Sequence, residues 1–199
     1  MNAFLIAACL SMSLLPAQAP ETFSPDPDGF IRNWLVLAPI GVEAGSGATE
    51  IDKDFLKGEA TIKPKPGDKV TVELRDLTWR PHTTSDFFID FLQAFGKERG
   101  EEVVAYAVAY IVADDEMKVK LSVGSNDQCK AWVNGKQIIR FGETRTLDKD
   151  TDSGDVTLAK GRNVLVFKVL NEVNNWQGAA RFTQNGAGVK NIKISLTPQ

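Results

Sequence analysis

The side chains best suited to binding chemistry lie in three polar stretches of the sequence. Residues 79–82 read Trp-Arg-Pro-His, residues 171–177 read Asn-Glu-Val-Asn-Asn-Trp-Gln, and residues 126–127 read Asn-Asp. A saccharide presents hydroxyl groups and flat apolar ring faces, so an aromatic platform and polar partners for each buried hydroxyl suit its site. The three stretches therefore predict a saccharide site on loops. Its candidate ligand-binding residues are Trp79, Arg80, His82, Asn126, Asp127, Asn174, Asn175 and Trp176.

Several of these residues also have a purely structural interpretation. Trp79 could anchor its loop on the core, and Trp176 could be a core residue because it opens a strand-like stretch. His82 could be an ordinary exposed loop residue, or a contact whose charge changes near neutral pH. The burial of the two tryptophans decides between the interpretations.

An acidic stretch predicts a second kind of site. Residues 148–155 read Asp-Lys-Asp-Thr-Asp-Ser-Gly-Asp, and calcium takes six to eight oxygen ligands. A helix–loop–helix calcium loop would end on Glu at its twelfth position, where this sequence has Ala159, so that motif is incomplete. The alternatives are a structural calcium site and an acidic loop in solvent. The candidate calcium ligands are Asp148, Asp150, Asp152 and Asp155.

The residue counts exclude other classes of site. One histidine and two cysteines fall short of the three or four ligands that a zinc site built from these residues needs. The sequence has no G-x-S-x-G motif for a serine nucleophile, and no spacing marks a pair of catalytic carboxylates. A formal net charge of −3 argues against a nucleic-acid partner. These observations favour a non-catalytic domain, with a glycoside hydrolase as an alternative.

The first nineteen residues have the pattern of a secretory signal peptide. Residues 3–15 are apolar, and residues 16–19 read Pro-Ala-Gln-Ala, an A-x-A cleavage pattern. We therefore expect export to the periplasm or the exterior, with lipoprotein anchoring at Cys9 as the alternative. Residues 20–29 are expected to form a proline-rich tether, and no later stretch is long enough to span a membrane. Cleavage would leave Cys129 alone, either as a small buried hydrophobe or as a reactive thiol.

The remaining residues, 30–199, predict a single all-β domain. Residues 69–75 and 117–123 alternate between apolar and polar, and Asn134-Gly135 between two apolar runs is a strong hairpin signal. Residues 76–85 have no periodicity and are expected to form a loop, whereas residues 87–95 are expected to form a short strand followed by a helical turn. About ten short antiparallel strands with Gly and Pro turns indicate a β-sandwich or barrel.

Four segments in order resemble a known family. They read NWLVLAPI at residues 33–40, GSNDQCKAWVNGK at 124–136, LAKGRNVLVFKV at 158–169 and WQGAARF at 176–182. The order resembles the galactose-binding-like jelly rolls attached to secreted bacterial glycoside hydrolases, and the sugar-binding sandwich of the family 2 hydrolases. This sequence differs at Asn126-Asp127, where the family has an acidic pair, and at Gln128, where the family has glycine.

The resemblance implies a jelly-roll β-sandwich of the galactose-binding type. It implies binding to a polysaccharide or oligosaccharide, whereas structural calcium is suggested by the acidic stretch at residues 148–155 alone. The alternative function is a structural or protein-interaction sandwich that has no sugar site and binds a protein partner at the cell surface. Trp34, Trp132 and Phe167 alternate with polar or small residues, so we expect them in the core.

Overall fold

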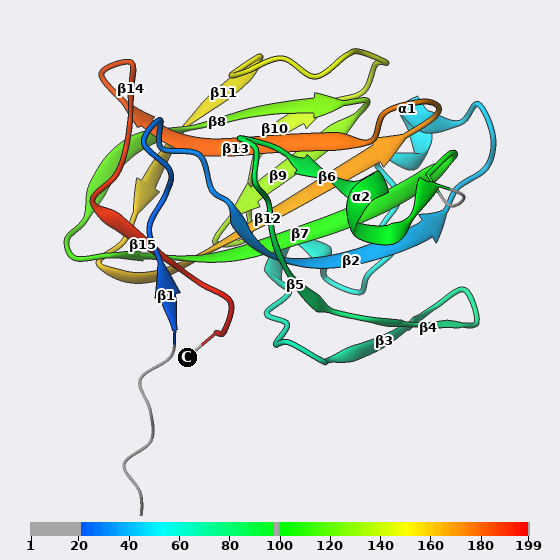
Figure 1. Cartoon of the computed structure of the whole chain (residues 1–199), viewed down its shortest axis with the longest axis horizontal. Coiled ribbons are helices and arrows are strands. Elements are labelled where there is room, and N and C mark those ends of the chain that lie inside the picture. Colours follow the sequence, from blue (N-terminus) through cyan, green and yellow to red (C-terminus); the bar gives the residue numbers. More distant parts are fainter. Residues whose placement is uncertain (1–20, 98–99, 199) are drawn as a thin grey trace, which may run out of the picture.

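The protein, seen here as a computed structural model, is described over residues 21–97 and 100–198 (Figure 1). The predicted signal peptide and the lipid anchor at Cys9 lie outside these residues. Two antiparallel sheets enclose the main core, so the all-β sandwich expected from the sequence is confirmed. In the described part of the chain, no helix has the length and apolar character needed to cross a membrane.

The larger sheet, called sheet A, has eight strands. At the centre of this sheet, one edge of β7 pairs with β12 along the full length of β7. The other edge of β7 pairs with β2 and with β15. The strands are β1 (Thr22–Phe23), β2 (Asn33–Gly41), β5 (Arg80–Thr83), β7 (Val103–Ala113), β9 (Cys129–Val133), β10 (Lys136–Phe141), β12 (Gly161–Asn171) and β15 (Ile192–Ser195).

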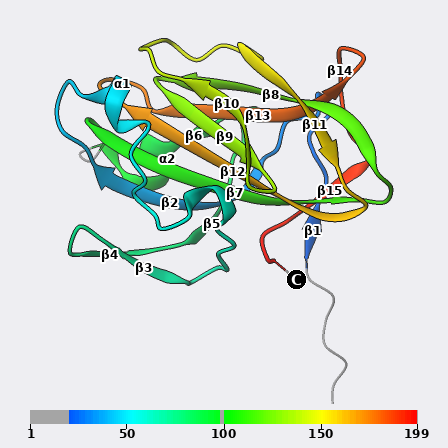
Figure 2. The same cartoon turned by 180° about the vertical axis from the view of Figure 1, so that it is seen from behind.

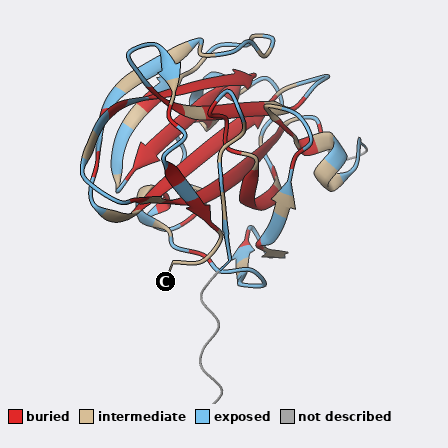
Figure 3. Cartoon of the chain, turned by 60° about the vertical axis from the view of Figure 1, so that its left-hand side comes forward, coloured by how far each residue is buried: buried red, intermediate tan, exposed pale blue. Residues whose placement is uncertain are grey.

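The smaller sheet, called sheet B, has five strands and faces sheet A across the core. Its central pair is β8 with β13, and β11 pairs with the free edge of β8. Figure 3 shows that the buried residues run along the central strands of the sandwich. The strands are β6 (Ile89–Asp90), β8 (Met117–Asn126), β11 (Asp152–Leu158), β13 (Gln177–Gln184) and β14 (Ala187–Gly188).

Apolar residues on both faces of sheet A are buried. Trp34 and Phe167 lie between the two sheets, whereas Tyr106 and Trp132 belong to a second cluster on the outer face. Residues 42–79, which we call the cap, cover this outer face (Figure 2). The core positions expected for Trp34, Trp132 and Phe167 are therefore confirmed. The cap contains α1 (Gly47–Glu50), the 3-10 helix η1 (Glu59–Thr61) and the hairpin of β3 (Lys69–Val72) with β4 (Arg75–Thr78).

A buried polar cluster fastens the cap to sheet A. The side chain of Lys168 is fully buried, and its Nζ donates to the backbone oxygens of Ile51 and Lys53 at 3.0 and 2.6 Å. The same Nζ lies 3.2 Å from Glu59 Oε2, which also accepts a hydrogen bond from the Tyr106 hydroxyl. Burial raises the pKa of Glu59 and lowers that of Lys168, because removal from water disfavours each charged form.

Two local predictions are confirmed. Asn134 and Gly135 have φ angles of 51° and 82°, which suit the two-residue turn that joins β9 to β10. The short strand β6 leads directly into the helical turn α2 (Phe91–Phe95), and Asp90 caps this turn by accepting from the Gln93 amide at 3.0 Å.

The expected loop at residues 76–85 is wrong, because the chain there forms parts of β4 and β5. β5 pairs with β2, yet Arg80, Pro81 and Thr83 are all exposed. A strand without a buried face needs no apolar alternation, so its sequence has no period to detect.

Candidate functional site

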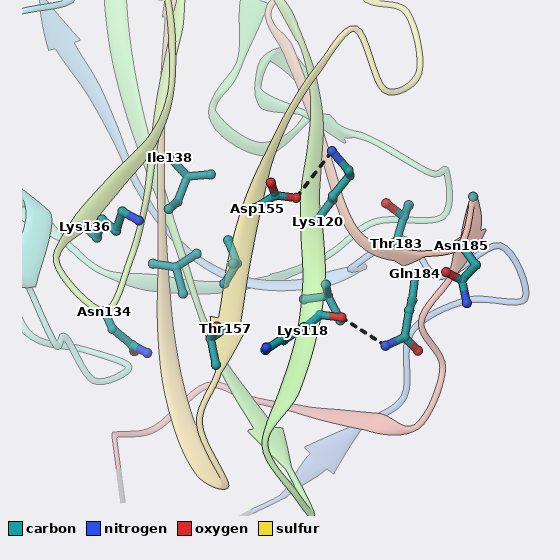
Figure 4. Close-up of a pocket in the computed structure, with 14 residues that line it drawn as sticks. Lys118, Lys120, Asn134, Lys136, Ile138, Asp155, Thr157, Thr183, Gln184 and Asn185 are labelled. Atoms are coloured by element: carbon teal, nitrogen blue, oxygen red, sulfur yellow. Dashed lines mark hydrogen bonds and ion pairs between the residues drawn. The ribbon is translucent and has the colours of Figure 1, made fainter.

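A groove of about 790 Å³ lies along sheet B (Figure 4). Its residues come from β8, from β11, from the end of β13 and the turn after it, and from the β9–β10 hairpin of sheet A. Val119 and Leu121 of β8 pack in the core, so the alternating Lys118 and Lys120 side chains point to solvent. The described lining residues are Lys118, Val119, Lys120, Val133, Asn134, Lys136, Ile138, Asp155, Val156, Thr157, Thr183, Gln184, Asn185 and Gly186.

Strand register sets the polar rows of the groove. Lys120 lies between Asp155 on β11 and Thr183 on β13, and its Nζ is 3.4 Å from the Asp155 carboxylate. One row further, Lys118 lies opposite Thr157. The groove thus places ammonium, hydroxyl and carboxylate groups side by side on an exposed face.

A patch of aromatic and cationic side chains lies further along the same face. Arg181 is two residues before Thr183 on β13 and forms a paired contact with Asp150. The Arg181 guanidinium also lies 4.6 Å from the Phe30 ring, and Lys149 lies 4.5 Å from the Phe87 ring. The sequence did not point to Arg181, Phe30, Lys149 and Phe87 or to the groove lysines. The one available signal was the alternation of Lys118 and Lys120 with apolar residues.

The predicted aromatic platform is wrong. Trp79 is 4% exposed where the cap packs on the outer face of sheet A, and Trp176 is 0% exposed between the sheets. The Trp176 ring packs on Phe91 with the ring centroids 5.0 Å apart, and its Nε1 donates to the Val169 oxygen at 3.2 Å. Neither indole face is open to a ligand, because each ring fills a core.

The other predicted residues do not form one site. Arg80 and His82 lie on β5 at the edge of sheet A, whereas Asn126 ends β8 in sheet B (Figure 1). Arg80 is exposed and His82 is half-buried, and burial lowers the pKa of the His82 imidazole. Asn174 and Asn175 are both exposed on the loop between β12 and β13.

Asp127 fastens loops and is only 6% exposed. Its two carboxylate oxygens accept from the backbone amides of Arg145 and Glu172 at 3.1 and 3.0 Å. Burial raises the pKa of Asp127 although these hydrogen bonds favour the charged form. Asn126 is also buried, and its Oδ1 has no partner among the described residues. The neighbouring Gln128 donates a hydrogen bond to Glu172 Oε1 at 2.6 Å, which ties the same two segments together.

The predicted calcium loop is wrong, because its carboxylates do not converge. Three of them pair with cations: Asp150 with Arg181, Asp152 with Arg145, and Asp155 with Lys120. Asp148 is exposed and accepts a hydrogen bond from the next backbone amide, that of Lys149. Within residues 21–97 and 100–198, no group of three or more His, Cys, Asp or Glu side chains could hold a metal ion.

Cys129 is a buried hydrophobe, as one of the two sequence interpretations proposed. It is fully buried, and burial raises the pKa of its thiol to about 11. The thiolate is the reactive form, so burial disfavours reaction of this cysteine in the folded domain.

Comparisons with known proteins give no family. The sequence matches no protein-family model and no curated protein. Among solved structures, Faecalibacterium prausnitzii β-glucuronidase is similar at a TM-score of 0.45 and 18% identity, over 81% of this chain and 23% of that chain. The PA14 domain of the MpAFP antifreeze protein is similar at 0.44 and 10% identity, over 93% of each chain. The PA14 sugar-binding domain of an RTX adhesin is similar at 0.42 and 12% identity, over 84% of this chain and 99% of that chain.

Proposed function

We propose that this domain binds a saccharide chain in the groove over sheet B. The observation that carries the proposal is the lining of the groove, where hydroxyl, amide and ammonium side chains share one open surface. Thr157, Gln184 and Asn185 are exposed there and offer both donors and acceptors for sugar hydroxyls. Saccharide hydroxyls need such partners when water is displaced.

The chemistry of the lining favours binding over hydrolysis. Glycosidases use two carboxyl groups about 5 to 9.5 Å apart. Of the described residues that line the groove, only Asp155 carries a carboxylate, and Lys120 pairs with it. We therefore propose a non-catalytic domain. This function agrees with the predicted export, which stays a prediction.

A glycan array on the purified chain tests the proposal. We expect wild-type protein to bind a subset of plant, algal or microbial glycans, with or without EDTA. Thr157→Trp should abolish the signal, because an indole at this exposed strand position fills the groove. The matched control is Thr71→Trp, which changes an exposed strand threonine on the β3–β4 hairpin instead. Thermal melting should show that both variants stay folded.

Three results would contradict parts of the proposal. An array without any wild-type signal would refute saccharide binding. Binding that survives Thr157→Trp would place the site elsewhere on the domain. Turnover of a polysaccharide would show that the domain is catalytic.

A protein-interaction role is the second candidate, and one observation favours it. Leu74 is 98% exposed at the tip of the β3–β4 hairpin, which projects from the sandwich (Figure 1). A domain of this kind would give a blank glycan array. Its association with a protein partner would weaken on Leu74→Ser and not on Thr157→Trp.

A further inference from the structure

The groove over sheet B carries a charge opposite in sign to that of the whole chain. Its lining includes Lys118, Lys120 and Lys136 but only one carboxylate, that of Asp155. The chain as a whole has a formal net charge of −3. Because Asp155 pairs with Lys120 at 3.4 Å, two of the three lysines keep their charge uncompensated in the groove.

The two uncompensated lysines are available to a ligand. Lys118 and Lys136 are both exposed, and no described carboxylate lies within ion-pair distance of either. A concave surface lined by one sign of charge concentrates the field and attracts ligands of the opposite charge. An ammonium group also donates stronger hydrogen bonds to an anionic oxygen than to a neutral one.

The lysines lie on both sides of strand β11. Lys118 and Lys120 project from β8, two residues apart and so about 6.8 Å apart along the strand. Lys136 projects from the β9–β10 hairpin on the opposite side of β11 (Figure 4). A ligand that contacts both Lys118 and Lys136 must cross β11 and carry more than one anionic group. This requirement excludes a single small anion and fits a chain.

We infer that the groove selects an anionic saccharide chain, one that carries carboxylate or sulfate groups. This inference rests on the proposed function, since it names the class of saccharide for the same site. Lys118 and Lys136 bind the anionic groups, while the hydroxyl and amide side chains beside them bind the sugar hydroxyls. Asp155 opposes the same ligand, because its carboxylate is the one negative charge among the described lining residues.

The test compares polymers that share a backbone and differ in charge. Titration calorimetry would use polygalacturonate against its fully methyl-esterified form, and dextran sulfate against dextran, each at low and high salt. In at least one of the two pairs, we expect the anionic polymer to bind at least about tenfold more tightly than its neutral form. This corresponds to a difference of about 1.4 kcal/mol in binding free energy. The polymer that shows this preference identifies carboxylate or sulfate as the preferred group. The preference should shrink at high salt, because salt screens exposed charges.

Charge variants then localise the preference. Lys118→Gln with Lys136→Gln should remove it, and Asp155→Asn should strengthen anionic binding a few-fold. The matched control is Lys69→Gln, an exposed strand lysine on the cap, which should bind as wild type does. An equal loss in the control would overturn the inference, because it would mean diffuse attraction to the whole surface.

The two proposals fail in different ways. Equal binding of the neutral and anionic polymers, lost on Thr157→Trp, would overturn the charge preference and leave saccharide binding intact. Preference for an anionic polymer that survives the double lysine variant would also overturn the inference. Absence of binding to every polymer, together with a blank glycan array, would refute both proposals.

Discussion

Gly124→Ala tests how the acidic loop lies across sheet B. Gly124 is on the outer face of β8, and a Cβ added there would lie 1.9 Å from the backbone oxygen of Asp148. Ordinary contact begins at 3.4 Å, so the loop would have to move outward by about 1.5 Å. The obstacle is backbone, which cannot rotate away as a flexible side chain can.

The cost of this movement follows from what holds the loop. Thr151 donates to the Val123 oxygen at 3.3 Å, and Asp150 pairs with Arg181. Overpacking of this kind typically costs about 1–3 kcal/mol, and we expect the upper part of that range because both contacts must lengthen. Total stabilities are about 5–15 kcal/mol, so the variant should still fold.

Urea denaturation monitored by tryptophan fluorescence measures the free energy of unfolding. The matched control is Gly41→Ala, because Gly41 has an ordinary φ and open space around its missing Cβ. That change should be neutral or stabilise by up to about 1 kcal/mol, since alanine restricts the unfolded chain. Hydrogen exchange should rise over residues 143–151 in Gly124→Ala alone. If Gly124→Ala unfolds at the same urea concentration as wild type, the loop does not contact β8 as described.

Three further outcomes follow from burial. Cys129 should not react with iodoacetamide at pH 8 until the chain unfolds, because its thiol has a pKa of about 11; labelling followed by mass spectrometry checks this. Trp176→Ala should cost about 3–5 kcal/mol in urea denaturation, and the folded fraction should keep its glycan affinity. Glu59 has a pKa raised above 4.5, so its folded state holds the proton more firmly than the unfolded state. The free energy of unfolding of wild type relative to Glu59→Gln should therefore fall as the pH rises from about 4.5 through that raised pKa. If this difference does not change with pH, the pKa of Glu59 is not raised in the folded state.

Local features of the fold could be predicted because nearby residues determine them. The Asn134-Gly135 turn requires positive φ at both positions, and few other residue pairs adopt it easily. The alternation in β8 similarly marks one apolar face, and that face packs in the core. These signals depend on neighbours in the chain rather than on the final fold.

The burial of Trp79 and Trp176 could not be predicted in the same way. Both tryptophans stand among polar residues in the sequence, and such a setting equally suits an exposed platform and a loop anchor. The deciding partners come from elsewhere in the chain: Phe91 packs on Trp176, and the outer face of sheet A packs on Trp79. The groove also depends on partners from distant parts of the chain, because the strand register brings Asp155 and Thr183 beside Lys120.

The cap determines which surface of the sandwich is available for binding. It covers the outer face of sheet A, and the two inner faces are packed against each other. The polar side chains at the loop end of the sandwich bind other parts of the chain. Asp127 accepts hydrogen bonds from two backbone amides, and Gln128 donates one to Glu172. The acidic loop is likewise tied to Arg145 and Arg181. The acidic loop covers the outer face of sheet B at Gly124, whereas Lys118, Lys120 and Thr157 on the same face stay exposed and are free to contact a ligand. A binding site on this face requires no rearrangement of the core, which is why substitutions such as Thr157→Trp can test function without testing stability.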